Sequence, residues 1–242
     1  MVEPESAVKN PMRSLIRISE IYASVQGEGL LTGTPSVFVR TSGCNLRCWF
    51  CDTPFASWKP EGPQLSITEI MEQTLRFEHQ HIVVSGGEPM IHRSLIGLCQ
   101  ALREHKKHIT IETAGTIYSQ VECDLISISP KLSNSAPAGS AGSWRQAHNA
   151  RRQRLEVVEA LMAEHPYQLK FVVDCAADAD EVLQYLSQLK SYDGDRVLLM
   201  PQGTQAAALD RQAEWLIPWC LKHEVRFCPR AHIHWFGNRR GT

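Results

Sequence analysis

The stretch TSGCNLRCWFCDTPF, residues 41–55, places three cysteines within eight positions behind a Ser-Gly turn. The C-x3-C-x2-C spacing of Cys44, Cys48 and Cys51 lets three thiolates converge on one centre. Structural zinc takes four ligands, commonly supplied as pairs, and no second pair supports this stretch. A [4Fe-4S] cluster also usually has four cysteine ligands, so three would leave one iron open to a small molecule. A zinc site completed by a distant histidine is the alternative.

Length and composition predict one domain over residues 1–242, with 1–13 as a flexible N-terminal extension. The chain has 242 residues, of which 43% are apolar, and this is enough for one sizeable core. No run of about 18 apolar residues and no secretory signal is visible, so we expect a soluble, cytoplasmic protein without a membrane partner. A formal net charge of -1 gives no case for binding nucleic acid. Eight cysteines without a signal peptide indicate a reducing compartment.

Short apolar runs alternate with helical patterns along the chain, which predicts an α/β fold with a mainly parallel sheet, either open or closed as a full or partial barrel. The predicted strands are 15–22, 36–40, 81–85, 108–112, 124–129, 169–173, 196–200 and 225–228. The predicted helices are 66–79, 93–106, 151–165, 178–190 and 211–223. Ser66 and Glu69 form a capping-box pattern at the first of these helices. Residues 133–143 are rich in Ser, Ala and Gly and predict a flexible loop.

A second motif, VVSGGEP at 83–89, places two glycines directly after an apolar strand. Gly86 and Gly87 would let backbone approach a ligand closely, and Glu88 could accept a hydrogen bond from an ammonium group. Taken alone, the motif is more typical of an ordinary turn between a strand and a helix.

Together the two motifs resemble the radical S-adenosylmethionine (SAM) superfamily, whose signature matches Cys44, Cys48, Phe50 and Cys51. The resemblance implies a single-domain, shortened TIM-like barrel. It also implies a [4Fe-4S] cluster on the three thiolates, with SAM on the fourth iron and Phe50 near its adenine. One electron then cleaves SAM to a 5'-deoxyadenosyl radical. In this reading Gly86, Gly87 and Glu88 bind the methionine part of SAM.

The stretch SVQGEGLLTGTPSVFVRTSGCN, residues 24–45, is similar to the N-terminal signature of the 7-carboxy-7-deazaguanine synthase family. The resemblance continues through CDTPF, SGGEP, IETAGT, ISPK and the terminal HIHWFGNRRGT, and it fails mainly between about 132 and 168. It implies a carbon-nitrogen lyase of queuosine biosynthesis. Such an enzyme converts 6-carboxy-5,6,7,8-tetrahydropterin to 7-carboxy-7-deazaguanine with loss of ammonia, after the radical removes the C6 hydrogen. Mg2+, an electron donor such as a flavodoxin, and a homodimer are implied as well.

Site residues follow from the matched motifs. Gln26 and Glu28 suit the alternating donors and acceptors of a pterin edge, and Arg40 offers a planar fork for its carboxylate. Thr53 falls on the family's magnesium ligand, and one hydroxyl with water and substrate oxygens is reasonable for that ion. The substrate-contact set is Val25, Gln26, Gly27, Glu28, Arg40, Ser85 and His232. The further SAM-contact set is Ser129, Pro130, Lys131, Met200, Pro201, Gln202 and Gly203, although Met-Pro-Gln reverses the family's Gln-Pro-Met order.

Two other functions fit part of the pattern. A glycyl-radical-enzyme activating enzyme has the same cysteine spacing, but it would need a surface for a protein substrate and no pterin pocket. A non-catalytic zinc or iron-sulfur module would need a fourth protein ligand. The QGEG turn at 26–29 and the C-terminal motif favour the synthase over both.

Overall fold

The computed structural model describes residues 15–242, so the predicted extension at 1–13 lies outside the described residues. Nine strands form one sheet in the order β3-β1-β2-β4-β5-β6-β7-β8-β9. From β2 to β9 all neighbours are parallel, while β1 runs antiparallel to β2 and β3 antiparallel to β1. The strands are β1 (Leu15–Val25), β2 (Pro35–Thr41), β3 (Gln64–Ser66), β4 (His81–Gly86), β5 (His108–Thr113), β6 (Leu125–Ile128), β7 (Tyr167–Val173), β8 (Val197–Pro201) and β9 (Arg226–Phe227).

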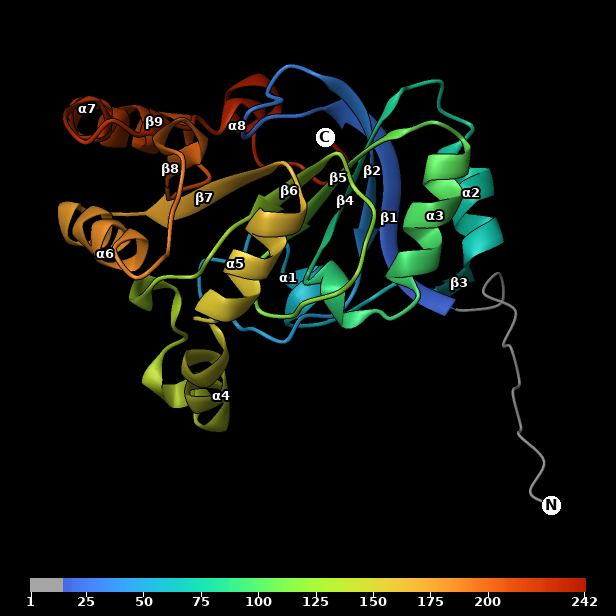
Figure 1. Cartoon of the computed structure of the whole chain (residues 1–242), viewed down its shortest axis with the longest axis horizontal. Coiled ribbons are helices and arrows are strands. Elements are labelled where there is room, and N and C mark those ends of the chain that lie inside the picture. The colour runs from blue at the N-terminus through green and yellow to red at the C-terminus, as the bar shows by residue number, and fades with distance from the viewer. Residues whose placement is uncertain (1–14) are drawn as a thin grey trace.

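Helices connect the parallel strands and cover the outer side of the curved sheet (Figure 1). Their bounds are α1 (Pro54–Ser57), α2 (Ile67–Thr74), α3 (Leu95–Glu104), α4 (Ser143–Arg151), α5 (Leu155–Glu164), α6 (Ala176–Leu186), α7 (Ala206–Lys222) and α8 (Ala231–Phe236). α2 packs on β1, α3 on β5, α5 on β6, α6 on β7 and α7 on β8. Since β3 and β9 stay at the two ends of the sheet, the barrel is open, which confirms the predicted α/β partial barrel. Within residues 15–242 no helix is long and apolar enough to cross a bilayer.

Two strands, β2 and β7, place apolar residues on the outer face and a charged residue on the inner face. On β2, Val37 and Val39 are fully buried in the main core, while Arg40 lies on the other side. On β7, Leu169 and Phe171 belong to the same core, and Lys170 between them faces inward. Because successive side chains of a strand point to opposite faces, each strand supplies both core and site.

Strand predictions hold within a few residues, with two exceptions. β3 was not predicted; Gln64–Ser66 pairs with the start of β1. The strand predicted at 225–228 is only Arg226–Phe227. The capping box of Ser66 and Glu69 is confirmed, with the Glu69 N–H donating to Ser66 Oγ and the Ser66 N–H donating to Glu69 Oε2. The helix it opens ends at Thr74 rather than 79, where the buried Thr74 hydroxyl donates to the Ile70 carbonyl.

The segment between 132 and 165 differs most from prediction. The helix predicted over 151–165 begins later, as α5 at Leu155, and α4 before it was not predicted. The chain turns between the two helices, where Arg152 donates to the Lys131 carbonyl and pairs with Glu181. The loop predicted as flexible at 133–143 contains the 3-10 turns Ser133–Ser135 and Gly139–Ala141. Side-chain hydrogen bonds hold this loop, including Asn134 Nδ2 to Asp178 Oδ2 at 2.8 Å. Tertiary contacts here override local composition.

A close backbone contact joins the Gly-Gly turn after β4 to the cysteine loop after β2. The Glu88 N–H donates to the Gly43 carbonyl at 2.8 Å, and the Gly87 N–H donates to the Thr41 carbonyl at 3.3 Å. A Cβ on Gly87 would stand 2.2 Å from the Gly43 carbonyl oxygen and 2.6 Å from that of Ala56. Only glycine fits at position 87, and the two loops are thereby fixed against each other.

Replacing Gly87 with alanine tests this contact. The added methyl group meets backbone oxygens that cannot rotate away, so the free energy of unfolding should fall by about 2 kcal/mol or more. Gly139→Ala is the matched control, since a Cβ there meets nothing within 4 Å, and it should change stability by less than about 0.5 kcal/mol. Urea denaturation of the two variants measures the difference, and equal stabilities would contradict the assigned contact.

Candidate active site

A pocket opens inside the sheet, at the ends of the strands where β2, β4 and β7 finish. It gathers residues from distant parts of the chain, as the carboxyl ends of parallel strands do. The predicted residues that line it are Val25, Gln26, Gly27, Glu28, Arg40, Cys44, Cys48, Phe50, Cys51, Thr53, Ser85, Gly86, Gly87, Ser129, Lys131, Met200, Gln202 and His232. The lining does not include Glu88, Pro130, Pro201 or Gly203.

The three predicted cluster cysteines lie half-buried on one wall of the pocket. Trp58 Nε1 donates to the Cys48 carbonyl at 2.9 Å, and the Cys51 Sγ lies 3.1 Å from Ser57 Oγ. Burial raises the pKa of the Cys44 thiol to about 12 and that of Cys48 to about 11. Both thiols are therefore protonated until a metal displaces the protons.

These cysteines fit a cluster better than one ion. Within residues 15–242, no three His, Cys, Asp or Glu side chains stand close enough together to ligate a single metal. A four-iron cluster instead takes each thiolate on a different iron, so its thiols are spread around one space. Three thiols that line a common pocket without converging on one point match that arrangement.

Glu88, predicted to bind an ammonium group, is fully buried beneath the pocket. Its oxygens accept hydrogen bonds from Thr113 Oγ1 and the Ala114 N–H, each at 2.8 Å, and from the Met90 N–H at 3.1 Å. Burial raises the pKa of this carboxyl despite those bonds. In the structure Glu88 thus ties the turn after β4 to the end of β5, and its contact with SAM stays a prediction.

A charged network crosses the opposite wall of the pocket. Lys170 Nζ lies 2.8 Å from Glu28 Oε2 and 3.1 Å from Glu112 Oε2, with a side chain only 5% exposed. Arg230 Nε lies 3.1 Å from Glu28 Oε1, and its guanidinium also bonds Asp52. Burial alone would raise the pKa of Glu28, but Lys170, Arg230 and His232 outweigh it and hold the pKa far below its usual range. Glu28 is therefore an ionised acceptor facing the pocket.

Arg40 and Gln26 each use part of their hydrogen-bonding capacity on other residues of the protein. Arg40 Nε lies 2.6 Å from Glu20 Oε1, and Nη2 donates to the Tyr22 hydroxyl at 2.9 Å. Burial would lower the pKa of Arg40, but Tyr22 and Glu20 raise it, so the guanidinium stays charged. Gln26 Nε2 donates a hydrogen bond to Ser36 Oγ. The side-chain carbonyl oxygen of Gln26 therefore remains available as an acceptor. The protein thus pre-orients both groups that face the pocket.

The remaining predicted residues surround the cysteine loop. Thr53 precedes α1, with Oγ1 3.7 Å from the Cys51 Sγ. Lys131 Nζ donates to the carbonyl and the hydroxyl of Ser129, so these two residues form one unit. The Gly203 carbonyl accepts from Arg230 instead of facing the pocket.

Sequence reasoning missed several residues of the pocket lining. Lys170 and Arg230 hold Glu28, and Tyr22 supports Arg40. A lone lysine within the apolar run LKFVV was a usable signal, because a charge inside a buried strand needs a partner. Thr242, in the tail that had no assigned role, also lines the pocket, and Figure 1 shows that end of the chain within the curve of the strands.

Comparisons with known proteins agree with this geometry. Residues 38–163 match the family model described as "Radical SAM superfamily". The 7-carboxy-7-deazaguanine synthase of Rhodopirellula baltica is 46% identical over 95% of this chain and 90% of its own length. The synthase of Halobacterium salinarum is 40% identical over 89% and 88%. Among solved structures, QueE from Escherichia coli superposes with a TM-score of 0.67 at 23% identity, covering 90% of this chain and 95% of that one, which shows the shared fold.

The open barrel and its three-cysteine loop define a radical SAM protein. Within that class, the similarity over nearly the whole chain shows that the protein belongs to the 7-carboxy-7-deazaguanine synthase family. Membership of this family indicates that the chain is an enzyme. It does not favour the alternative of a glycyl-radical-enzyme activating enzyme.

Lys170→Met tests the charged network. Removing the ammonium leaves Glu28 and Glu112 without their shared partner in a buried place, so the free energy of unfolding should fall by about 3 kcal/mol or more. Lys190→Met is the control, because Lys190 pairs with Glu159 while 86% of its side chain is exposed, and such pairs contribute roughly 0–1 kcal/mol. Urea denaturation at pH 7 measures both, and similar losses would contradict a special role for Lys170.

Proposed function

We propose that this chain converts 6-carboxy-5,6,7,8-tetrahydropterin to 7-carboxy-7-deazaguanine with loss of ammonia, as a carbon-nitrogen lyase of queuosine biosynthesis. The observation that carries the proposal is one pocket with two unlike walls. Three thiols and a glycine turn line one wall, and an ionised glutamate held by Lys170 and Arg230 lines the other. The pocket could therefore hold a radical-forming cofactor and a polar heterocycle next to each other.

Cys44, Cys48 and Cys51 would hold the cluster, and SAM would lie beside it. When bound, the cluster and SAM together supply the 5'-deoxyadenosyl radical that removes the C6 hydrogen. Phe50 offers an apolar face next to the thiols, and Gly87 brings backbone to the same wall. The further predicted contacts of SAM are with Gly86, Glu88, Ser129, Pro130, Lys131, Met200, Pro201, Gln202 and Gly203.

The opposite wall suits the pterin. Glu28, kept ionised, would accept hydrogen bonds from pterin N–H groups, and the Gln26 carbonyl oxygen would accept another. Arg40, whose Nε and Nη2 already have partners, would use its remaining nitrogen on the substrate carboxylate. His232 lies 3.9 Å from Glu28, and burial lowers its pKa. It would thus contact the substrate as a neutral ring, and Val25, Gly27 and Ser85 would complete the contacts.

Thr53 is proposed as the protein ligand of Mg2+. Thr53 lines the pocket two residues after Cys51, with Oγ1 3.7 Å from the Cys51 Sγ. Magnesium usually keeps several waters and takes few protein ligands, so one hydroxyl and the oxygens of the substrate would suffice. Asp52 is less suited to direct contact, because its carboxylate bonds Arg230.

The proposal extends to the cellular setting. A flavodoxin-like electron donor, a cytoplasmic location and a homodimer are what the family resemblance implies. All eight cysteines are free thiols, which suits a reducing compartment. Sedimentation velocity of the purified protein distinguishes a dimer from a monomer.

The reaction is tested with anaerobically purified and reconstituted protein. The mixture contains SAM, a reductant, Mg2+ and the carboxylated tetrahydropterin, and mass spectrometry detects the deazapurine acid. We expect this product, with SAM regenerated. An intact cluster that cleaves SAM without forming the product would rule out the proposed substrate.

Thr53→Ala separates the magnesium site from the cluster. Loss of the hydroxyl should abolish most of the stimulation of turnover by Mg2+, while the visible absorption of the cluster is unchanged. Thr53→Ser keeps the hydroxyl and should retain the stimulation. If the alanine variant instead loses the cluster, Thr53 acts on the cysteine loop and the two roles are not separate.

A further inference from the structure

The cysteine loop has a second side, which faces away from the pocket. Trp49 stands between Cys48 and Cys51 in the sequence, and its side chain is 56% exposed. The Trp49 indole is fixed, because Nε1 donates to the Asn134 carbonyl at 2.7 Å. In the proposed function the pocket side is filled by SAM and substrate. An electron that reaches the loop from another protein must then enter from the Trp49 side.

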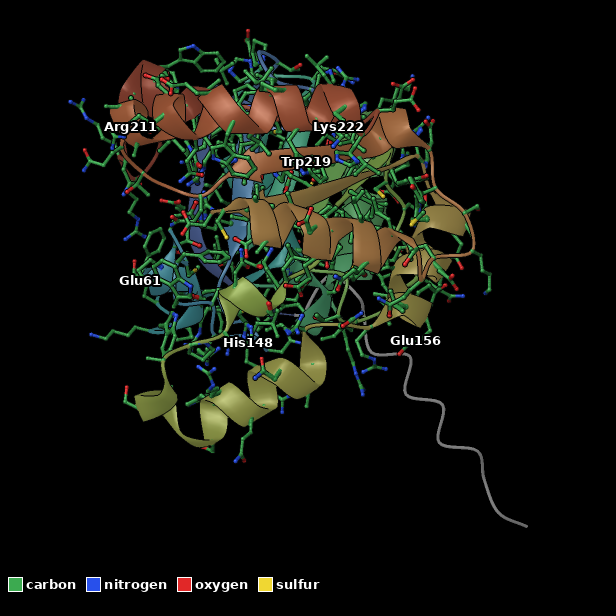
Figure 2. All side chains as sticks on the ribbon, turned by 90° about the vertical axis from the view of Figure 1, so that its left-hand side faces the viewer. Glu61, His148, Glu156, Arg211, Trp219 and Lys222 are labelled. Carbon is green, nitrogen blue, oxygen red and sulfur yellow. The ribbon has the colours of Figure 1, made fainter. Side chains whose placement is uncertain are left out.

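Helix α4 is anchored directly to this side of the loop. The buried His148 accepts a hydrogen bond at Nδ1 from the Arg47 N–H, at 3.1 Å, so its Nε2 carries the proton and donates to Ser135 Oγ at 2.9 Å. Ser135 in turn donates to the Leu132 carbonyl. Figure 2 shows His148 on the side of α4 that faces the body of the protein. The helix is thus held to the backbone between Cys44 and Cys48.

A second contact fixes the exposed part of the helix. The Arg47 guanidinium lies 4.0 Å from the centre of the Trp144 ring, and Arg47 itself is only 9% exposed. Trp144 is 42% exposed. Two exposed tryptophans, one on the loop and one on α4, therefore flank the same short stretch of backbone. Aromatic side chains are typical of protein-protein contact sites.

The exposed surface of α4 and the turn after it is strongly basic. Residues 143–154 contain four arginines and no acidic residue, although the whole chain has a net charge of -1. Arg145, Arg151 and Arg154 are exposed, and we call these three with Trp49 and Trp144 the basic face. Of the three, only Arg154 has a carboxylate partner among the described residues, Glu156. This local charge favours an acidic partner.

We propose that the basic face is the docking site of an acidic protein that carries single electrons. The carrier gives up one electron and is oxidised, and the cluster on the three cysteines accepts that electron. This proposal rests on the proposed function, because it requires that cluster. An electron carrier is favoured over nucleic acid because the basic face lies directly on the cysteine loop, and the electron must reach the cluster through this loop.

The test uses the full-length reconstituted protein and a reduced flavodoxin as the acidic probe. Arg145→Glu/Arg154→Glu reverses two charges that make no contact with the cysteine loop in the structure. Arg211→Glu/Lys222→Glu makes the same charge change on α7, which Figure 2 shows at the opposite edge of the molecule from α4. Isothermal titration calorimetry at low salt measures flavodoxin binding without turnover. We expect Kd to rise about tenfold for the α4 variant and little for the control.

Formation of 5'-deoxyadenosine in the absence of the pterin, where SAM is cleaved and not regenerated, provides the functional readout. With flavodoxin the α4 variant should need a higher carrier concentration for half-maximal rate, whereas with dithionite its rate should equal that of the unmodified protein. This readout requires only cleavage of SAM, so a missing deazapurine product would count against the proposed substrate and leave the docking test intact.

Three outcomes would overturn the proposal. In the first, both variants bind flavodoxin as tightly as the unmodified protein. In the second, the α4 variant changes the mass of the protein in sedimentation, which would assign the face to a second copy of the chain. In the third, flavodoxin binding is unchanged but the α4 variant loses affinity for an RNA duplex, which would assign the face to nucleic acid. If dithionite-driven cleavage also falls, Arg145→Gln/Arg154→Gln repeats the test without introducing new charges.

Discussion

The architecture of the site depends on the contact between two turns that contain glycine. Gly87 lies against the carbonyl oxygens of Gly43 and Ala56, so no side chain can be accommodated there. Thr41 and Gly86 are paired in register at the ends of β2 and β4. The sheet therefore determines where the cysteine loop begins, and the glycine contact determines how near it comes to the second turn. A cluster and a cofactor can meet in the pocket only because these two loops are in van der Waals contact.

The charged wall opposite the cysteines has a different physical basis. Buried ion pairs contribute little net stability, since desolvation offsets much of the attraction. Lys170, Arg230 and Glu28 are nevertheless kept together at the mouth of the barrel, with Glu28 ionised. Perturbed groups concentrated in one pocket are typical of functional sites. In the proposed function, that arrangement presents fixed acceptors and donors to a heterocycle.

Most of the fold could be predicted from the sequence, because strands covered on both faces read as near-continuous apolar runs with clear ends. The cysteine spacing and the QGEG turn also pointed to residues that line the pocket. Lys170 and Arg230 could not be assigned, since their partner Glu28 is 142 and 202 residues away in the chain. Position 148 was missed for the same reason, as its hydrogen bond reaches Arg47 across 101 residues. Local sequence patterns indicate which residues are buried and where turns occur. Pairing between side chains that are far apart in the sequence is seen only in the three-dimensional structure.

The stretch without a recognisable motif, between about 132 and 168, illustrates the consequence. Its residues 133–143 are rich in Ser, Ala and Gly, so composition predicted a flexible loop there. In the structure Asn134, Ser135 and His148 accept hydrogen bonds from Trp49 and Arg47 on the outer side of the cysteine loop. The loop is thus supported on both sides, by glycine backbone toward the pocket and by α4 toward solvent. A radical enzyme needs one face of its cluster closed to water and the other reachable by a reductant, and this division of the loop between two elements meets both requirements.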